Sequence, residues 1–374
     1  MDFKFMKRAL ELAQKGIGYT KPNPLVGAVI VKNGRIIGEG YHQIYGSHHA
    51  EINAFRNATE DVSGATMYVT LEPCSHYGKT PPCANAIVEK GIKKVVIGLL
   101  DPNPLVAGRG VEILKNNGIE VVSGILEDEG KKLNEIFLKY ITTRLPFGIL
   151  KTAMTLDGKI ASPIGDSKWI TNELSRQYVH AIRHRVSGIM VGIGTILADN
   201  PELTTRLKDE DGVDPIRIIV DSTAKIPLDA KVLNLDSKAK TIIATTEKAD
   251  EKRLKGIWDK GADIIVTPLK NDRVDLGYLM QRLGERAIDS VLIEGGAALN
   301  FSALEEAVVD KVVSFIAPKI IGGAASKTPV GGDGISFMKN AIQLDNIQIS
   351  RFQEDIMIEG YLRKGGSFSC LPDL

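Results

Sequence analysis

The first third of the chain carries a set of side chains suited to binding one zinc ion. His49-Ala50-Glu51 is followed by Pro73-Cys74 and then by Cys83. A structural zinc site is normally closed by four protein ligands, whereas a catalytic site keeps three and leaves the fourth position to water. One His and two Cys supply three ligands, and Glu51 is left over. The pattern therefore predicts a catalytic zinc site with His49, Cys74 and Cys83 as its ligands.

Glu51 suits the proton transfer that such a site requires. Zinc lowers the pKa of a water molecule toward neutrality, and a carboxylate beside the His can take up the proton and deliver it to a leaving amine. A His-x-Glu motif with Pro-Cys and a second Cys is typical of zinc-dependent hydrolytic deaminases that act on nucleobase-like rings. Glu51 is accordingly the candidate catalytic residue.

The spacing between the two cysteines is longer than in the common deaminase motif, which has two intervening residues. Here residues 75–82 intervene, so they must form a loop that returns Cys83 to the metal. The alternative is two buried cysteines and a surface histidine without a metal. Against it, residues 66–71 are predicted to form a strand that ends just before Cys74, and residues 84–90 a helix that begins after Cys83. Strand ends and helix starts are where α/β proteins place their ligands.

Composition indicates a globular protein with an ordinary core. The 374 residues are 43% hydrophobic and 25% charged, and 47 basic against 46 acidic residues give a net charge of +1. Without a basic stretch, nothing in the sequence demands a nucleic acid partner. We find no apolar run of membrane-spanning length and no signal-peptide pattern. Two of the three cysteines are assigned to zinc, which favours a reduced, cytoplasmic protein.

Hydrophobic periodicity divides the chain into two α/β domains, 1–145 and 146–374, joined at a linker over residues 144–148. For the first domain we expect helices at 5–16, 49–58, 84–90, 111–117 and 127–143, and strands at 26–31, 36–40, 66–71, 94–100 and 120–125. For the second we expect strands near 149–156, 188–192, 216–221, 241–245, 264–267, 291–294 and 311–317. Its helices are expected near 172–185, 249–260, 276–285 and 298–307.

The residues of the second domain indicate an anion-binding α/β domain and no more. No Gly-x-Gly-x-x-Gly motif follows its first strand, so a dinucleotide-binding Rossmann fingerprint is absent there. The glycines of 192–195 and 294–297 follow strands and could let backbone amides approach a phosphate, although a plain tight turn explains them equally well. Arg183, His184, Arg185 and Arg206 could bind a phosphate monoester, although Arg183 and Arg185 could equally be solvated helix charges.

Taken together, the motifs resemble those of the bifunctional deaminase/reductase family of riboflavin biosynthesis, over essentially the full length of the chain. In the first half the matching stretches are residues 22–29, Gly40-Tyr41-His42, His48-His49-Ala50-Glu51 and the whole of 71–83. The long loop between the cysteines is itself typical of that family. In the second half they are residues 150–161, 167–171, 183–185, 192–195, 199–206 and 293–296.

The resemblance implies a cytidine-deaminase-like three-layer domain followed by a dihydrofolate-reductase-like domain. It also implies two cofactors, Zn²⁺ and NADPH. The expected substrate is 2,5-diamino-6-ribosylamino-4(3H)-pyrimidinone 5′-phosphate, a small phosphorylated pyrimidine. Hydrolytic loss of its 2-amino group would come first, and NADPH-dependent reduction of the ribosyl group to ribityl second. Members of this family are often oligomers, so a homo-oligomer is expected.

The resemblance also implies a role for each residue that occupies a functional position in the family's motifs. Asn23, His42, His76 and Lys79 are expected to line the deaminase pocket. In the second half the substrate-binding set is Ser167, Arg183, Leu203, Arg206 and Glu294, and the two arginines suit the phosphate group. The cofactor-binding set is Ala153, Trp169, Thr195, Asp199, Ser222, Gly296, Ala297, Ala298 and Leu299. From the sequence alone, His76 and Lys79 could equally be solvent-facing loop residues, and Trp169 could be ordinary core.

Two other functions remain open at this point. One is a nucleic-acid base deaminase with an unrelated second domain, which the balanced charge supports poorly. The other is a binding module held together by zinc, without turnover. A structural zinc site gains nothing from a nearby uncoordinated carboxylate, so Glu51 argues against it.

Overall fold

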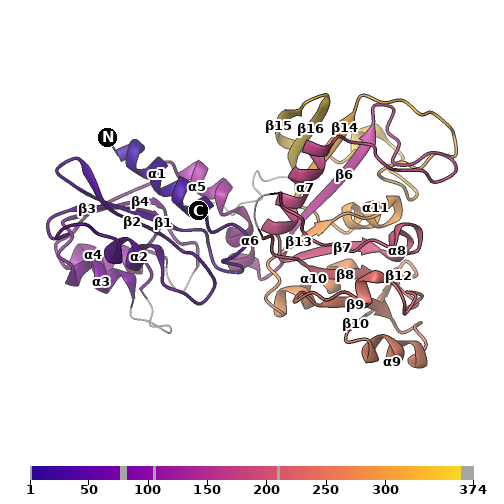
Figure 1. Cartoon of the computed structure of the whole chain (residues 1–374), viewed down its shortest axis with the longest axis horizontal. Helices are drawn as coiled ribbons and strands as arrows, with labels where there is room; N and C mark the ends of the chain where they lie inside the picture. Colours follow the sequence, from indigo (N-terminus) through magenta and orange to yellow (C-terminus); the bar gives the residue numbers. More distant parts are fainter. Residues whose placement is uncertain (1, 76–81, 104–106, 209–210, 364–374) are drawn as a thin grey trace. The chain divides into compact units, whose positions relative to one another are not determined.

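The computed structural model describes residues 2–75, 82–103, 107–208 and 211–363. The chain divides after Thr143 into two compact units, which we call unit 1 and unit 2 (Figure 1). Within the described residues, no helix combines the length and the apolar character that a bilayer crossing requires.

Unit 1 is built on a five-stranded sheet with the order β2-β1-β3-β4-β5. β1 is antiparallel to β2 and β3, whereas β3, β4 and β5 are parallel to one another. The strands are β1 (Gly27–Lys32), β2 (Arg35–Tyr41), β3 (Thr66–Leu71), β4 (Lys94–Leu99) and β5 (Glu120–Ser123). The helices are α1 (Asp2–Gln14), α2 (Ala50–Arg56), α3 (Cys83–Glu89), α4 (Arg109–Asn116), α5 (Glu127–Leu133) and α6 (Glu135–Thr143).

Alternation along β1 explains the three layers of unit 1. Ala28 and Ile30 pack against α2, α3 and α4, whereas Val29 and Val31 point to the opposite face and pack against α1. Successive side chains of a strand face opposite sides, so one strand can serve both layers. Figure 1 shows α1 and α5 on one side of this sheet and α2, α3 and α4 on the other. The expected three-layer arrangement is confirmed.

Unit 2 is built on a nine-stranded sheet with the order β10-β9-β8-β7-β13-β6-β14-β16-β15, of which the first seven strands are parallel. β16 runs antiparallel to both β14 and β15. The parallel strands are β6 (Phe147–Thr155), β7 (Gly188–Gly192), β8 (Ile216–Val220), β9 (Thr241–Thr246), β10 (Asp263–Thr267), β13 (Ser290–Ile293) and β14 (Lys311–Ala317). The remaining strands are β15 (Leu344–Phe352), β16 (Asp355–Leu362) and a small ribbon of β11 (Leu269–Lys270) and β12 (Arg273–Val274).

Helices cover both faces of the larger sheet. α10 and α11 pack on one face around Met190 and Ile218, whereas α8 and α9 pack on the other around Ile189 and Ile219. The helices are α7 (Glu173–Arg185), α8 (Ile193–Asp199), α9 (Glu251–Asp259), α10 (Leu276–Glu285) and α11 (Ala297–Glu305), with short 3₁₀ turns η1 (Lys231–Leu233) and η2 (Met338–Asn340).

Most elements lie where the periodicity predicts them, and the exceptions are short or late in the chain. The helix expected at 127–143 is interrupted at Asn134, whose side chain exchanges hydrogen bonds with the backbone of Leu25. The seven-residue α8 and the hairpin β15–β16 were not predicted. The hairpin turns at Gln353, which has a φ of 55°, in place of the glycine or asparagine that would announce such a turn.

Candidate active sites

The predicted zinc ligands converge in unit 1 because each lies where an element begins or ends. His49 immediately precedes α2, and Cys83 is the first residue of α3. Cys74 follows the end of β3 by three residues. The backbone N–H of Cys83 donates to the sulfur of Cys74 at 3.2 Å, which orients that thiol. Two helix starts and one strand end therefore direct their side chains to a common point.

The distances fit a zinc ion. His49 Nδ1 lies 3.5 Å from Cys74 Sγ and 3.3 Å from Cys83 Sγ. Tetrahedral zinc, with bonds of about 2.3 Å to sulfur and about 2.0 Å to nitrogen, places S and N ligands roughly 3.5 Å apart. All three ligand atoms lie within 4.8 Å of one another, and no second cluster of this kind occurs in the part of the chain that the structure describes.

The electrostatics of the cluster favour a bound cation. The Cys74 pKa is lowered to about 4, chiefly because Cys83 and His49 hydrogen-bond to its sulfur. The same contact with Cys74, together with burial, raises the pKa of Cys83 well above its ordinary value. The second thiol can ionise beside the first only when a positive charge offsets their repulsion, and a divalent ion would provide it.

Glu51 lies beside these ligands, in the first turn of α2, and is only 3% exposed. Burial raises the pKa of its carboxyl to about 7. It lines a cavity of about 260 Å³ together with His49 and Cys74. The carboxyl is therefore next to the metal ligands and open to a small molecule in the cavity.

The same cavity contains two of the residues assigned to the substrate. His42 Nδ1 lies 3.1 Å from the carbonyl of His48, which can only accept, so this nitrogen must carry the proton. In the neutral ring Nε2 is then an acceptor for Asn23 Nδ2, at 3.2 Å. Burial lowers the pKa of His42, which favours this neutral form. Asn23 and His42 are thus fixed in orientation at the wall of the cavity, whereas His76 and Lys79 lie outside the described residues.

Glu72 is a residue of this site to which the sequence assigned no role. Its buried carboxylate accepts hydrogen bonds from the backbone N–H groups of Asp101, Gly108, Gly110 and Val111, at 2.9 to 3.3 Å. Asp101 and Asn103 line the cavity as well. A carboxylate directly after a buried strand was the available signal. Glu72 fixes one wall of the cavity by holding the backbone that follows β4.

In unit 2 the residues assigned to the cofactor lie along one edge of the sheet. Ala153 is near the end of β6, Thr195 is in the first turn of α8 after β7, and Ser222 follows β8 by two residues. Gly296 precedes α11, which follows β13. Because β6, β13, β7 and β8 are parallel neighbours, these residues share the carboxyl edge, where open α/β sheets bind ligands.

The backbone at this edge has room for a phosphate-bearing ligand. Apart from chain neighbours and the helix's own backbone, no described atom lies within 4 Å of the position that a Cβ would take on Gly194 or Gly296, so the starts of α8 and α11 are open. Backbone amides at helix starts are suited to phosphate groups. Asn300, in α11, also has a buried side-chain oxygen without a hydrogen-bond partner among the described residues. These features fit a dinucleotide such as NADPH.

The other cofactor residues differ in exposure. Ala297, Ala298 and Leu299 form the first turn of α11, and Leu299 packs into the core. Asp199 is exposed at the end of α8. Trp169 is 63% exposed, and the Arg176 guanidinium lies 4.6 Å from its ring centre, so it is not a core residue.

A second cavity, of about 580 Å³, adjoins β6 and α7. Its lining includes Ala153, Ser167, Trp169, Arg183 and Arg206 from the predicted sets. Its charged lining residues are Lys151, Arg176, Arg183, Arg206 and Lys208 against Glu173 alone. This positive excess suits an anionic ligand. Leu203 does not line the cavity: its side chain belongs to the core beside α8, and its φ is 56°.

A buried ion pair stands at the wall of this second cavity. Arg183 donates to both carboxylate oxygens of Glu294, at 2.7 and 3.3 Å, and to the carbonyl of Thr204 at 3.0 Å. Burial by itself would raise the Glu294 pKa, but the charges of Arg183 and Lys151 outweigh it and lower the pKa to about 2. Much of the Arg183 charge is therefore balanced within the protein, whereas the Arg206 side chain is 60% exposed.

Lys151 and His180 line the second cavity and were not singled out from the sequence. Burial lowers the pKa of Lys151, and the charge of Arg183 adds to this effect while Glu294 opposes it. Burial and the charges of Arg183 and Arg206 lower the His180 pKa to about 4. The backbone N–H of Arg206 donates to His180 Nδ1 at 3.2 Å. A lysine in the middle of a buried strand was the signal that could have identified Lys151.

Comparison with known proteins agrees with the predictions for both halves of the chain. Residues 146–358 match the family model "RibD C-terminal domain", and residues 1–99 match "Cytidine and deoxycytidylate deaminase zinc-binding region". The riboflavin biosynthesis protein RibD of Actinobacillus pleuropneumoniae is 50% identical over 96% of this chain and 94% of its own length. That of Aquifex aeolicus is 44% identical over 96% and 98%.

Solved structures give the same result. Acinetobacter baumannii RibD superposes with a TM-score of 0.87 at 39% identity, covering 97% of this chain and 99% of that one. A diaminohydroxyphosphoribosylaminopyrimidine deaminase/5-amino-6-(5-phosphoribosylamino)uracil reductase from Thermotoga maritima gives 0.82 at 42% identity, with the same coverage. An unrelated second domain is thereby excluded, and with it the alternative of a nucleic-acid base deaminase built in that way.

Proposed function

The chain belongs to the RibD family of bifunctional deaminase/reductases of riboflavin biosynthesis, and we propose that its two units act in turn on one phosphorylated pyrimidine. Residues 1–145 would deaminate 2,5-diamino-6-ribosylamino-4(3H)-pyrimidinone 5′-phosphate, and residues 146–374 would reduce the ribosyl group of the product to ribityl. The observation that carries the proposal is the convergence of His49, Cys74 and Cys83 beside the buried Glu51.

In unit 1, His49, Cys74 and Cys83 would hold the zinc ion. Zinc, when bound, would lower the pKa of a water molecule toward neutrality. Glu51 would take the proton of that water and pass it to the 2-amino group, which leaves as ammonia. Asn23 and the neutral His42 would hold the ring by hydrogen bonds across the cavity, with His76 and Lys79 as further candidates. Because Glu51 is no ligand, it stays available for both proton transfers.

In unit 2, the carboxyl edge from Ala153 to Leu299 would hold NADPH, which supplies a hydride when bound. Asp199 and Ser222 would contribute to this binding, together with the open helix starts at Thr195 and Gly296. Trp169 would offer its exposed ring face to the ligand. We propose NADPH rather than NADH on the basis of the family, because no motif in this sequence indicates binding of a 2′-phosphate.

The cationic cavity beside this edge would hold the phosphorylated ribosyl group. Arg206 would bind the 5′-phosphate, with Ser167 and the backbone at Leu203 beside it, while Arg183 and Glu294 would form a fixed wall. Reduction at C1′ would break the bond from C1′ to the ribose ring oxygen, and that oxygen would take up a proton. Lys151 lies in the cavity wall and would donate it.

We also propose that the chain is cytoplasmic and that it forms a homo-oligomer. The use of two cysteines as metal ligands favours a reducing compartment.

One assay tests the proposed function. The purified chain is given the diaminopyrimidinone phosphate with and without NADPH, and ammonia and pyridine-nucleotide absorbance are followed separately. We expect ammonia in both samples and NADPH consumption only after deamination. Absence of ammonia from zinc-loaded protein would refute the proposal for unit 1, and unchanged NADPH absorbance after complete deamination would refute it for unit 2.

A further inference from the structure

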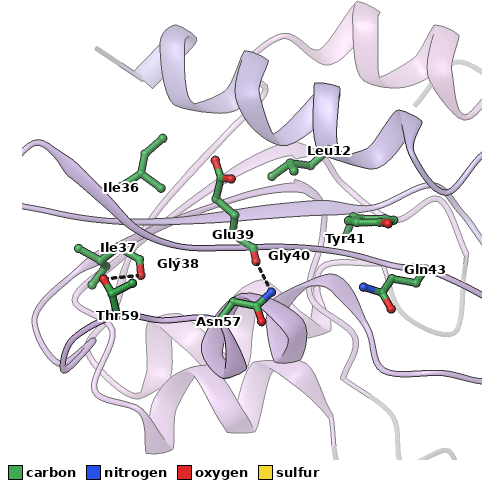
Figure 2. A pocket seen from close by; sticks show the side chains of 10 residues that line it. All are labelled: Leu12, Ile36, Ile37, Gly38, Glu39, Gly40, Tyr41, Gln43, Asn57 and Thr59. Carbon is green, nitrogen blue, oxygen red and sulfur yellow. Dashed lines mark hydrogen bonds between the residues drawn. The ribbon is translucent and has the colours of Figure 1, made fainter.

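A third cavity, of about 410 Å³, runs along β2 in unit 1, and its polar side chains are bonded within the protein. Asn57 donates to the carbonyl of Glu39 at 2.9 Å (Figure 2). Thr59 donates to the carbonyl of Ile37 at 3.3 Å. The Glu39 carboxylate in turn accepts from Arg8 at 2.8 and 3.0 Å. These contacts are directed to one another, so this cavity gives no indication of a ligand.

In the second cavity, by contrast, an aromatic side chain is held in the open. Trp169 lines this cavity and is 63% exposed. The Arg176 guanidinium lies over its ring, 4.6 Å from the ring centre. Lys319 Nζ donates to the carbonyl of Trp169, and Arg176 Nη1 donates to that of Thr171, both at 2.6 Å. Isolated exposed apolar residues are common on protein surfaces, but this one is fixed by three separate contacts.

The position of Arg176 on α7 explains how the contact is held. Arg176, His180 and Arg183 follow one another at intervals of four and three residues, so they lie on one face of the helix. All three line the second cavity. Asn172 caps the helix, since its side chain accepts from the backbone N–H of Ser175 at 3.0 Å. Arg176 therefore extends from the anchored first turn of α7.

Arg176 differs from the other arginines of this cavity in what its charge faces. Arg183 is paired with Glu294, and Arg206 lies 3.5 Å from Glu202. Within the part of the chain that the structure describes, Arg176 forms no ion pair, and its guanidinium meets an aromatic face and a backbone carbonyl. A planar guanidinium can stack on a ring and donate in its own plane at the same time. Arg176 is thus suited to holding a ring.

The contact with Arg176 covers one face of the indole and leaves the other face open. An open aromatic face suits another flat ring, since aromatic systems favour offset stacking. Trp169 shares the second cavity with Ala153, and both belong to the cofactor set. The reacting atoms of a hydride transfer must come within about 3.5 Å of one another, so the cofactor would reach the substrate cavity with its nicotinamide. The ring expected beside Trp169 is therefore the nicotinamide.

We infer that Arg176 is a positioning residue of the reductase, which holds the Trp169 indole so that its open face meets the nicotinamide ring. Arg176 acts through Trp169 and through the backbone at Thr171, and it binds neither the cofactor nor the substrate itself. This inference rests on the proposed function, which assigns Trp169 to the cofactor. It adds a residue to which neither the sequence motifs nor the family resemblance gave a role.

Fluorescence tests whether Arg176 holds the ring, without any cofactor. The chain has two tryptophans, and Trp258 is an exposed residue of α9, so Trp258→Phe leaves Trp169 alone. In this background Arg176→Met should lower the tryptophan anisotropy by about a third or more, because the indole then moves on the nanosecond timescale. Arg282→Met is the matched control, since Arg282 is a cation of α10 paired with Glu285 of the same helix. An anisotropy unchanged by Arg176→Met would overturn the inference.

Kinetics of the reduction test where the held ring acts. Arg176→Met should raise the KM for NADPH about fivefold, the size of effect expected from a cation–π contact, while the KM for the deaminated substrate stays within about twofold. Arg176→Lys should recover part of this loss, because an ammonium can face the ring but lacks the planar fork that also reaches Thr171. Circular dichroism verifies that each variant is folded. A rise in the substrate KM instead would mean that Arg176 binds the phosphate itself, and would overturn the inference.

A double-mutant cycle shows whether Arg176 acts through Trp169. Trp169→Leu should itself raise the KM for NADPH, and Arg176→Met should then raise it by less than about twofold more, since the ring that it holds is already absent. Effects that multiply would overturn the inference and leave the proposed function standing. A wild-type chain that binds no NADPH would overturn both the inference and the proposed function of unit 2.

Discussion

The functional residues of the candidate sites in unit 1 and unit 2 are brought together in different ways. In unit 1 the three candidate zinc ligands and Glu51 come from one segment, residues 49–83, and from the ends of three consecutive elements. In unit 2 the cavity draws on residues from Lys151 to Lys208, with Glu294 behind it on a strand far along the chain. The first site is a short motif with a fixed chemistry. The second is a group of charged side chains that come together only when the sheet of unit 2 has formed.

This difference should appear in the response to single substitutions. A catalytic carboxylate beside a metal has no substitute, whereas a cavity with five basic residues can lose one and keep part of its binding. The following changes are designed to test that contrast.

The largest effect is expected at Glu51. Glu51→Gln should lower ammonia release by about 10³-fold, within the usual range for a general acid–base residue, while zinc content stays unchanged. NADPH-dependent reduction of the already deaminated compound should continue at the wild-type rate. Glu39→Gln is the control, because Glu39 is a partly exposed carboxylate of the same unit, paired with Arg8. Loss of zinc from Glu51→Gln would make Glu51 a ligand and would contradict its assigned role.

The buried ion pair should give unit 2 a distinctive response to acid. Arg183 and Lys151 hold the Glu294 pKa at about 2, below its ordinary 4.5. A carboxyl with a lowered pKa stabilises the folded state above its unfolded pKa, and this contribution is lost as the pH falls from about 4.5 toward 2. The full contribution corresponds to a free energy of unfolding on the order of 3 kcal/mol.

Glu294→Gln cannot ionise, so the stability difference between the wild type and this variant should shrink over that pH range. Calorimetry at several pH values measures this stability difference as the shift of the unfolding transition between the wild type and Glu294→Gln. Parallel pH profiles for the two proteins would contradict the assigned ion pair.

A smaller effect is expected at Arg206, whose side chain is mostly exposed. Arg206→Ala should raise the KM of the reduction about tenfold, because one charge-assisted hydrogen bond to phosphate is lost while other cations remain. Arg206→Lys should recover part of this loss by keeping the charge. Steady-state kinetics of both the reduction and the deamination measure these changes in KM. An equal loss of deamination would mean that the two sites are not independent.

The sequence predicted the site of unit 1 more fully than that of unit 2 for a physical reason. Ligand types and their spacing limit a metal site strongly, so the sequence pattern alone was enough to single out His49, Cys74 and Cys83 as candidate ligands. The position of Glu72 after a buried strand marked it as a candidate, but its role could not be predicted, because it depends on backbone amides about 30 to 40 residues later. In unit 2, Arg183 was interpreted as a phosphate ligand, but the fold gives it Glu294 as a partner. Long-range pairing of this kind leaves no local pattern.

The helices and strands likewise divide into those that the sequence predicted and those that it did not. Alternation and helical periodicity predicted most strands and helices, because burial on one face leaves a regular pattern. The hairpin of β15 and β16 was missed: residues 346–351 of β15 are exposed, and its turn has Gln353 where glycine or asparagine is usual.

The most direct test of the central claim is elemental analysis of the freshly purified chain and of Cys83→Ala. The claim is that three side chains of unit 1 hold a zinc ion that Glu51 serves. It predicts one zinc per wild-type chain, and little zinc and no ammonia release from Cys83→Ala, while reduction of the deaminated compound continues. A wild-type chain that releases ammonia without bound metal, or a Cys83→Ala variant that keeps both zinc and activity, would contradict it.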